Sequence, residues 1–130
     1  MPSPQIVANG LTRTVAHLRR SGVKVIFLRD SLDIAVELSE YCKLRSPLMK
    51  KDCTIPKSEF MRNRSAEDRL VRNLLNHYPD LIIVDPMDTF CDQENCFLMR
   101  NGVLYFRDQH HLGIAGSRML ATLLEKQLGP

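Results

Sequence analysis

Two short apolar runs constrain the fold of this chain most strongly. They are VKVIFL at 23–28 and LIIV at 81–84, and a stretch with helical periodicity precedes each of them. Continuous β-branched runs of this length are typical of parallel strands whose two faces are both covered by helices. The sequence therefore predicts an α/β domain with a three-layer α/β/α arrangement.

Helical patterns lie on both sides of these runs. Apolar residues recur at near-helical spacing over 5–20, and Ser21-Gly22 then supplies a stop signal. The tetrapeptide SAED at 65–68 resembles a capping box, and Pro79 ends the helix that should follow it. Each of these helices precedes an apolar run, which is the order found in βαβ units.

The remaining segments are predicted as follows. Residues 31–41 favour another short helix, and 42–58 look irregular because they hold two Cys, two Pro and four Lys. Asn101-Gly102 is the strongest two-residue hairpin signal, and it predicts strands over 96–100 and 103–106. A last helix is expected over 113–127, with an apolar face that should be buried, formed by Ile114, Met119, Leu120, Leu123 and Leu124.

Between the hairpin and the last helix, the chain reads DQHHLGIAG. Spacing i to i+3 on a tight turn can bring the carboxylate of Asp108 to Nδ1 of His111. Such a carboxylate fixes the tautomer, so that Nε2 can take a proton from a hydroxyl. The adjacent His110 should point elsewhere. The alternative is structural: Asp108 caps the last helix, and His111 is a partly buried loop residue.

Residues 85–119 resemble the C-terminal part of SGNH (GDSL-like) hydrolase domains. The resemblance is closest to the domains fused to multi-span membrane acyltransferases that O-acetylate bacterial surface polysaccharides, such as lipopolysaccharide. A weaker likeness extends it to about 20–125. The residues that carry it are Asp85-Pro86, Cys91, Cys96, Gly102, Leu104-Tyr105, Asp108, His111-Leu112 and Gly116.

This resemblance implies a flavodoxin-like fold and an esterase or O-acyltransferase that acts on acyl esters of carbohydrate. His111 would be the general base and acid, and Asp108 its orienting partner, for a serine that forms an acyl-enzyme. The family's G-D-S block and oxyanion-hole blocks are not found in the sequence. Ser31 in FLRDSLD mimics that block, but Arg29 replaces its glycine, so Ser31 fits an N-terminal helix cap better than a nucleophile.

The missing blocks suggest that residues 1–130 are the C-terminal portion of an SGNH domain, incomplete on its N-terminal side. The expected partners are then the N-terminal SGNH portion and a membrane acyltransferase domain. The alternative function is a catalytically inert remnant or binding module, in which the Asp108–His111 pair is only structural. No motif for a cofactor or a metal ion is found, and none is expected.

Four cysteines allow three interpretations. They could form disulfides, as in an extracytoplasmic protein. Cys91 and Cys96 could instead bind zinc with a histidine, or all four could be free buried thiols. Four cysteines permit three full pairings, which sequence cannot distinguish. The family resemblance supports two local bridges, Cys91 with Cys96 and Cys42 with Cys53.

Composition narrows the possible partners and location. The 130 residues suffice for one domain with a core, and 15 acidic residues are mixed among 18 basic ones, for a net charge of +3. This mixture favours a solvated surface, and a small basic nucleic-acid-binding domain is the weakest alternative. No apolar stretch approaches the ~20 residues of a membrane span. MPSPQIVANG is not a signal peptide, so the chain alone would be cytoplasmic, and the family resemblance implies a periplasmic domain.

Overall fold

The computed structural model describes residues 2–30, 33–34, 41–42 and 52–129. Its helices and strands confirm the predicted α/β class. Most of the helix expected over 31–41 lies outside the described residues. The elements are α1 (Pro4–Arg20), β1 (Ile26–Leu28), β2 (Cys53–Pro56), α2 (Lys57–Arg62), α3 (Ser65–His77), β3 (Ile82–Val84), α4 (Met87–Phe90), β4 (Asn95–Arg100), β5 (Val103–Leu104) and α5 (Ile114–Leu128).

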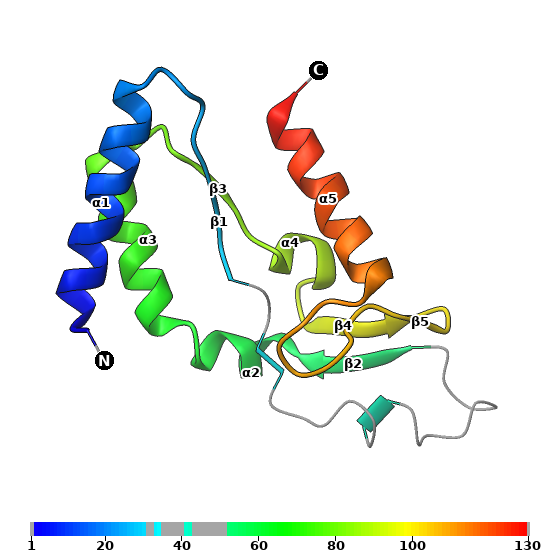
Figure 1. Ribbon diagram of the computed structural model, residues 1–130. Helices are drawn as coiled ribbons and strands as arrows, with labels where there is room; N and C mark the ends of the chain where they lie inside the picture. Colours follow the sequence, from blue (N-terminus) through cyan, green and yellow to red (C-terminus); the bar gives the residue numbers. More distant parts are fainter. Residues whose placement is uncertain (1, 31–32, 35–40, 43–51, 130) are drawn as a thin grey trace.

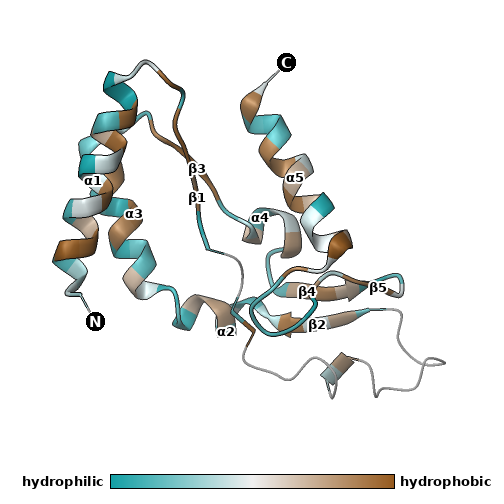
Figure 2. Cartoon of the chain, in the orientation of Figure 1, coloured by the Kyte–Doolittle hydropathy of each residue, from teal (hydrophilic) through white to brown (hydrophobic). Residues whose placement is uncertain are grey.

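The two predicted apolar runs form a parallel pair. β1 lies beside β3, with Ile26 opposite Ile82 and Leu28 opposite Val84. Figure 1 shows α1 and α3 together on one side of this pair and α5 on the other. In Figure 2 both strands are among the most apolar segments. Their core with the helices contains Val15, Leu74 and Leu81, with Leu11, Phe27 and Ile83 packed against them.

A second sheet is antiparallel, in the order β2-β4-β5. Its hairpin confirms the Asn-Gly prediction, because Asn101 and Gly102 both have positive φ, at 51° and 78°. The prediction of an irregular 42–58 is wrong for its C-terminal end, where β2 pairs with β4 and α2 begins at Lys57. A four-residue strand is too short to show an alternation of apolar and polar residues. Whether β2 forms a strand is therefore decided by its pairing with β4.

The ends of two helices also differ from expectation. SAED is not a capping box: α3 begins at Ser65, its N-cap is Arg64, and no side chain caps it. Asp68, the carboxylate of that box, is directed elsewhere, because it accepts a hydrogen bond from Arg29. In α5, Ile114 is 76% exposed rather than buried. The other four expected core residues of α5 are only half-buried.

Candidate active site

The segment between β5 and α5 closes on itself as a compact loop. The backbone N–H of Arg107 donates to the carbonyl of His111 at 2.8 Å, and Phe106 pairs with Leu112 in an antiparallel bridge. At its base the N–H of Gly113 donates to the carbonyl of Tyr105, also at 2.8 Å. We call residues 105–113 the Asp–His loop. These contacts fix the backbone of the loop.

Within the loop, the structure brings Asp108 and His111 together. Nδ1 of His111 lies 2.7 Å from Oδ1 of Asp108. The same oxygen accepts the backbone N–H groups of His110 and His111, each at 2.9 Å. The N–H of His110 and the ring of His111 hold the pKa of Asp108 well below its ordinary value. A carboxylate can only accept hydrogen bonds, so Nδ1 of His111 carries the proton, and Nε2 is the basic nitrogen.

Two details considered for a structural role of this pair differ from the structure. The N-cap of α5 is Gly113, and no side chain caps that helix, so Asp108 does not serve as its cap. The side chain of His111 is not partly buried, since 61% of it is exposed. The pair is therefore accessible at the surface of the loop.

The Asp–His loop is tied to the segment that follows β1. Nδ1 of His110 lies 2.9 Å from Oδ1 of Asp33, and the N–H of Ile34 donates to the carbonyl of Gln109 at 3.0 Å. His110 thus points away from Asp108, as expected. Ser31, the possible nucleophile, lies outside the described residues.

A glycine allows α5 to approach the loop closely. A Cβ placed on Gly116 would lie 2.1 Å from the carbonyl oxygen of Tyr105 and 3.1 Å from a methyl group of Leu112. No real Cβ makes a contact as short as the first one. Gly116 therefore lets the first turn of α5 pack directly on the backbone of the Asp–His loop.

A cavity of about 620 Å³ lies next to the loop. Asp33 lines this cavity and also contacts His110, so the two features adjoin. Apolar side chains from α1, β1 and α3 form much of the wall. Its polar lining residues are Asp30, Asp33, Asn63, Arg64 and Glu67. They include residues just after the carboxyl end of β1, the edge at which open α/β sheets bind ligands.

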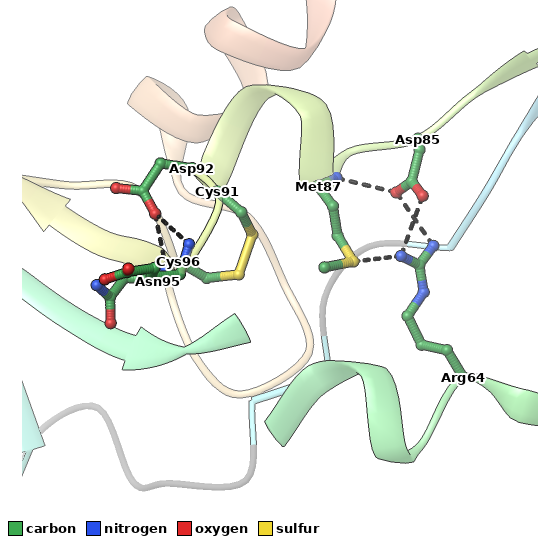
Figure 3. Close-up of a disulfide and its surroundings, with 8 residues drawn as sticks. Arg64, Asp85, Met87, Cys91, Asp92, Asn95 and Cys96 are labelled. Carbon is green, nitrogen blue, oxygen red and sulfur yellow. Dashed lines mark hydrogen bonds and ion pairs between the residues drawn. A yellow bond between two sulfur atoms is a disulfide. The ribbon is translucent and has the colours of Figure 1, made fainter. Parts of the chain in front are cut away.

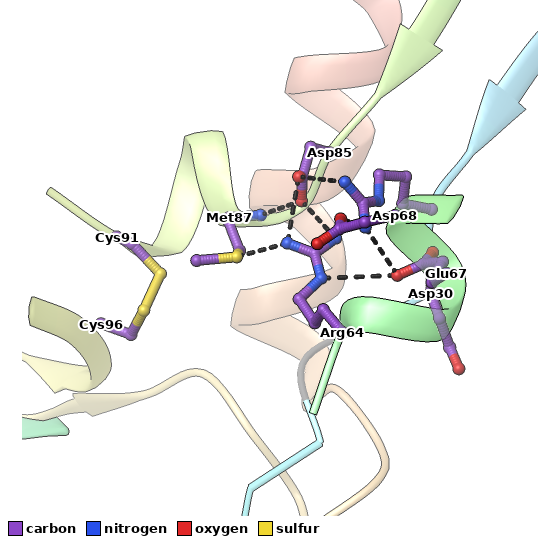
Figure 4. A network of polar contacts seen from close by, with 9 residues as sticks. Asp30, Arg64, Glu67, Asp68, Asp85, Met87, Cys91 and Cys96 are labelled. Atoms are coloured by element: carbon purple, nitrogen blue, oxygen red, sulfur yellow. Dashed lines mark hydrogen bonds and ion pairs between the residues drawn. A yellow bond between two sulfur atoms is a disulfide. The ribbon is translucent and has the colours of Figure 1, made fainter. Parts of the chain in front are cut away.

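A network of charges adjoins one side of this cavity (Figure 4). Arg64 donates to both carboxylate oxygens of Asp85, at 3.0 and 3.1 Å, and Arg29 binds Glu67 and Asp68 at 3.0 and 2.6 Å. Partial burial by itself raises the pKa of Glu67, but its hydrogen bonds from Arg29 and the N–H of Asp30 outweigh burial and lower it. The sequence named Asp85 only within the family resemblance, and Glu67 and Asp68 only as part of a helix start. Nothing in it linked these residues to Arg29 or Arg64.

All four cysteines form the two local disulfides that the family resemblance supported. Cys42 is bonded to Cys53, and Cys91 to Cys96 (Figure 3). The zinc site and the free thiols are therefore wrong as alternatives. Across the described ranges, no group of three His, Cys, Asp or Glu residues is placed to hold a metal ion. No helix in those ranges is long and apolar enough to cross a bilayer.

Comparison with known proteins identifies one family. A model described as "SGNH domain (fused to AT3 domains)" matches residues 2–126, which is nearly the whole chain. No curated protein and no solved structure matches the chain significantly.

Proposed function

The chain belongs to the SGNH domain family, and on that premise we propose that it supplies the acid–base half of a serine esterase or O-acyltransferase. This enzyme would move an acetyl or similar acyl group onto or off a carbohydrate hydroxyl. The observation that carries the proposal is the 2.7 Å contact between Nδ1 of His111 and a carboxylate that two backbone N–H groups also hold. The cavity beside the loop supports a sugar substrate, because carboxylate, amide and guanidinium groups all bind hydroxyls.

The proposed chemistry follows from the fixed tautomer. Nε2 of His111 takes the proton of a serine hydroxyl as its oxygen attacks the acyl carbonyl. Asp108 stabilises the imidazolium that results. The bond from the carbonyl carbon to the donor oxygen then breaks, and His111 returns the proton to that oxygen. An acceptor hydroxyl, or water, reverses these steps to release the acyl group from serine.

The serine and the oxyanion hole are proposed to lie outside these 130 residues. The sequence lacks a G-D-S block, so we infer that the chain is the C-terminal portion of an SGNH domain. The N-terminal portion would supply the nucleophile, and a membrane acyltransferase domain would deliver acyl groups. The family's description, which mentions fusion to AT3 domains, supports this membrane partner. Two disulfides support an extracytoplasmic, periplasmic location. With that location, surface polysaccharide is the acceptor that we propose.

The test is hydrolysis of p-nitrophenyl acetate by the longer protein proposed above, called here the full-length protein, and by this chain alone. In the full-length protein, His111→Ala and Asp108→Asn should each lower kcat by ~10³-fold or more. His77→Ala is the matched control, because His77 is an exposed histidine at the end of α3, and it should leave kcat unchanged.

The chain alone should hydrolyse the ester no faster than the buffer does. Activity of the chain alone that disappears in Ser31→Ala would instead identify Ser31 as the nucleophile. Full activity of His111→Ala in the full-length protein would refute the acid–base role and support the inert remnant.

A further inference from the structure

We propose that Arg64 is a positioning residue for the Asp108–His111 pair: it fixes α4, and α4 supports the Asp–His loop. This inference rests on the proposed function, since it assigns Arg64 a part in the same site. Arg64 lies 44 positions before Asp108 in the sequence and just before α3. The connection between them runs through Asp85, the short helix α4 and its last residue, Phe90.

The first step is the pairing of Arg64 with Asp85. Nη1 and Nη2 of Arg64 bind separate carboxylate oxygens of Asp85, and the Arg64 side chain is only 14% exposed. A bidentate, largely buried pair has one preferred geometry, unlike an exposed ion pair. Arg64 also contacts the sulfur of Met87, in the first turn of α4 (Figure 3).

The second step is the attachment of α4 at both ends. At its start, Oδ1 of Asp85 accepts the N–H of Met87 at 2.9 Å. At its end, the N–H of Cys91 donates to the carbonyl of Met87, and the disulfide joins Cys91 to Cys96 in β4. A four-residue helix has too few internal hydrogen bonds to be stable alone, so these attachments set its position.

The third step is the contact between α4 and the Asp–His loop. Phe90 and Phe106 are each 1% exposed, and their ring centroids are 5.3 Å apart. The centroid of the Tyr105 ring is 6.0 Å from that of Phe90. Tyr105 and Phe106 form one side of the base of the loop, where they pair with Gly113 and Leu112. A close-packed core transmits a shift of α4 to these residues, and so to Asp108 and His111.

The experiment measures the pKa of the Asp108 carboxyl by carbon NMR in the isolated chain. That pKa reports loop geometry, because it depends on the N–H of His110 and on the His111 ring. In Arg64→Met it should rise toward the ordinary aspartate value of about 3.9. Arg64→Lys keeps the positive charge but cannot bind both carboxylate oxygens of Asp85 as a guanidinium does. The pKa of Asp108 should therefore rise less than in Arg64→Met. Arg19→Met removes the Arg19–Asp80 ion pair, far from α4, and should leave the pKa of Asp108 at its wild-type value.

The result that would overturn the proposal is an unchanged Asp108 pKa in Arg64→Met, with the α1 and α3 signals still native. If that variant does not fold, Asp85→Asn replaces it, because asparagine keeps an oxygen for the Met87 N–H and loses the charge that binds Arg64. The same rise is expected there, and its absence would equally refute the role of Arg64. This pKa measurement requires no enzymatic turnover. Failure of the proposed function would be seen separately, as full activity of His111→Ala.

Discussion

The contact between Gly116 and Tyr105 gives the sharpest test of how α5 holds the Asp–His loop. In Gly116→Ala, the new methyl group would lie 2.1 Å from the carbonyl oxygen of Tyr105. An ordinary contact needs at least 3.4 Å, so the two backbones must separate by roughly 1 Å. A backbone carbonyl has no rotamer to change, so the loop or the helix must move as a whole.

The expected magnitude follows from two opposing effects. Alanine favours a helix interior over glycine by about 1 kcal/mol, which stabilises the folded chain. Overpacking of a tight contact costs about 1–3 kcal/mol, and the upper part of that range applies because backbone atoms meet. The free energy of unfolding should therefore fall by about 1–2 kcal/mol, and Tm by several degrees.

Gly10→Ala is the matched control. Gly10 lies within α1, and a Cβ there would meet nothing within 4 Å. Gly10→Ala should gain only the higher helix propensity of alanine, which raises the free energy of unfolding by up to about 1 kcal/mol. Urea denaturation followed by circular dichroism measures both variants. If Gly116→Ala were stabilised as much as Gly10→Ala, the close approach of α5 to Tyr105 would be refuted.

Three further predictions concern other parts of the molecule. The folded-state pKa of Asp108 is lowered, so the stability that its contacts contribute is present above the unfolded pKa of about 3.9. That stability is lost as the pH falls from there toward the folded-state pKa. The difference in unfolding free energy between wild type and Asp108→Asn should therefore shrink in urea titrations from pH 6 to pH 2. Leu74→Ala should cost about 2–5 kcal/mol, whereas exposed Leu128→Ala should change stability by less than about 0.5 kcal/mol, by the same urea assay. Replacing both Cys42 and Cys53 by alanine opens an 11-residue loop and should cost about 3 kcal/mol, seen as a lower Tm by calorimetry; an unchanged Tm would contradict this bridge.

The features that the sequence predicted correctly are those with local causes. A continuous apolar run identifies a parallel strand without knowledge of its partner, although β1 begins only at Ile26 and its Leu28 is 41% exposed rather than buried. Asn101-Gly102 fixes its hairpin through its own backbone preferences. The contact of Asp108 with His111 is local too, because only three positions separate them. The catalytic roles of Asp108 and His111 stay a prediction.

The features that the sequence did not predict depend on residues far apart in the chain. Asp68 stands where the predicted capping box needs a carboxylate, yet it binds Arg29, 39 positions earlier, instead. The pairing of Arg64 with Asp85 gives no sequence pattern, because it depends on how the start of α3 lies against the end of β3. Similarly, β2 becomes a strand only because β4 lies beside it.

The exposure of the site and of α5 supports the proposal that a further portion of the domain completes it. Among the described residues β1 pairs with β3 alone, and a two-stranded sheet is small for an α/β domain. Ile114, in the first turn of α5, is among the most exposed large apolar side chains, and His111 beside it is mostly exposed as well. An acid–base pair works best where water is excluded, because hydrogen bonds and charges then act at lower dielectric. A segment that brought a serine to Nε2 of His111 would also cover this surface. It would therefore supply the nucleophile and exclude water from the acid–base pair.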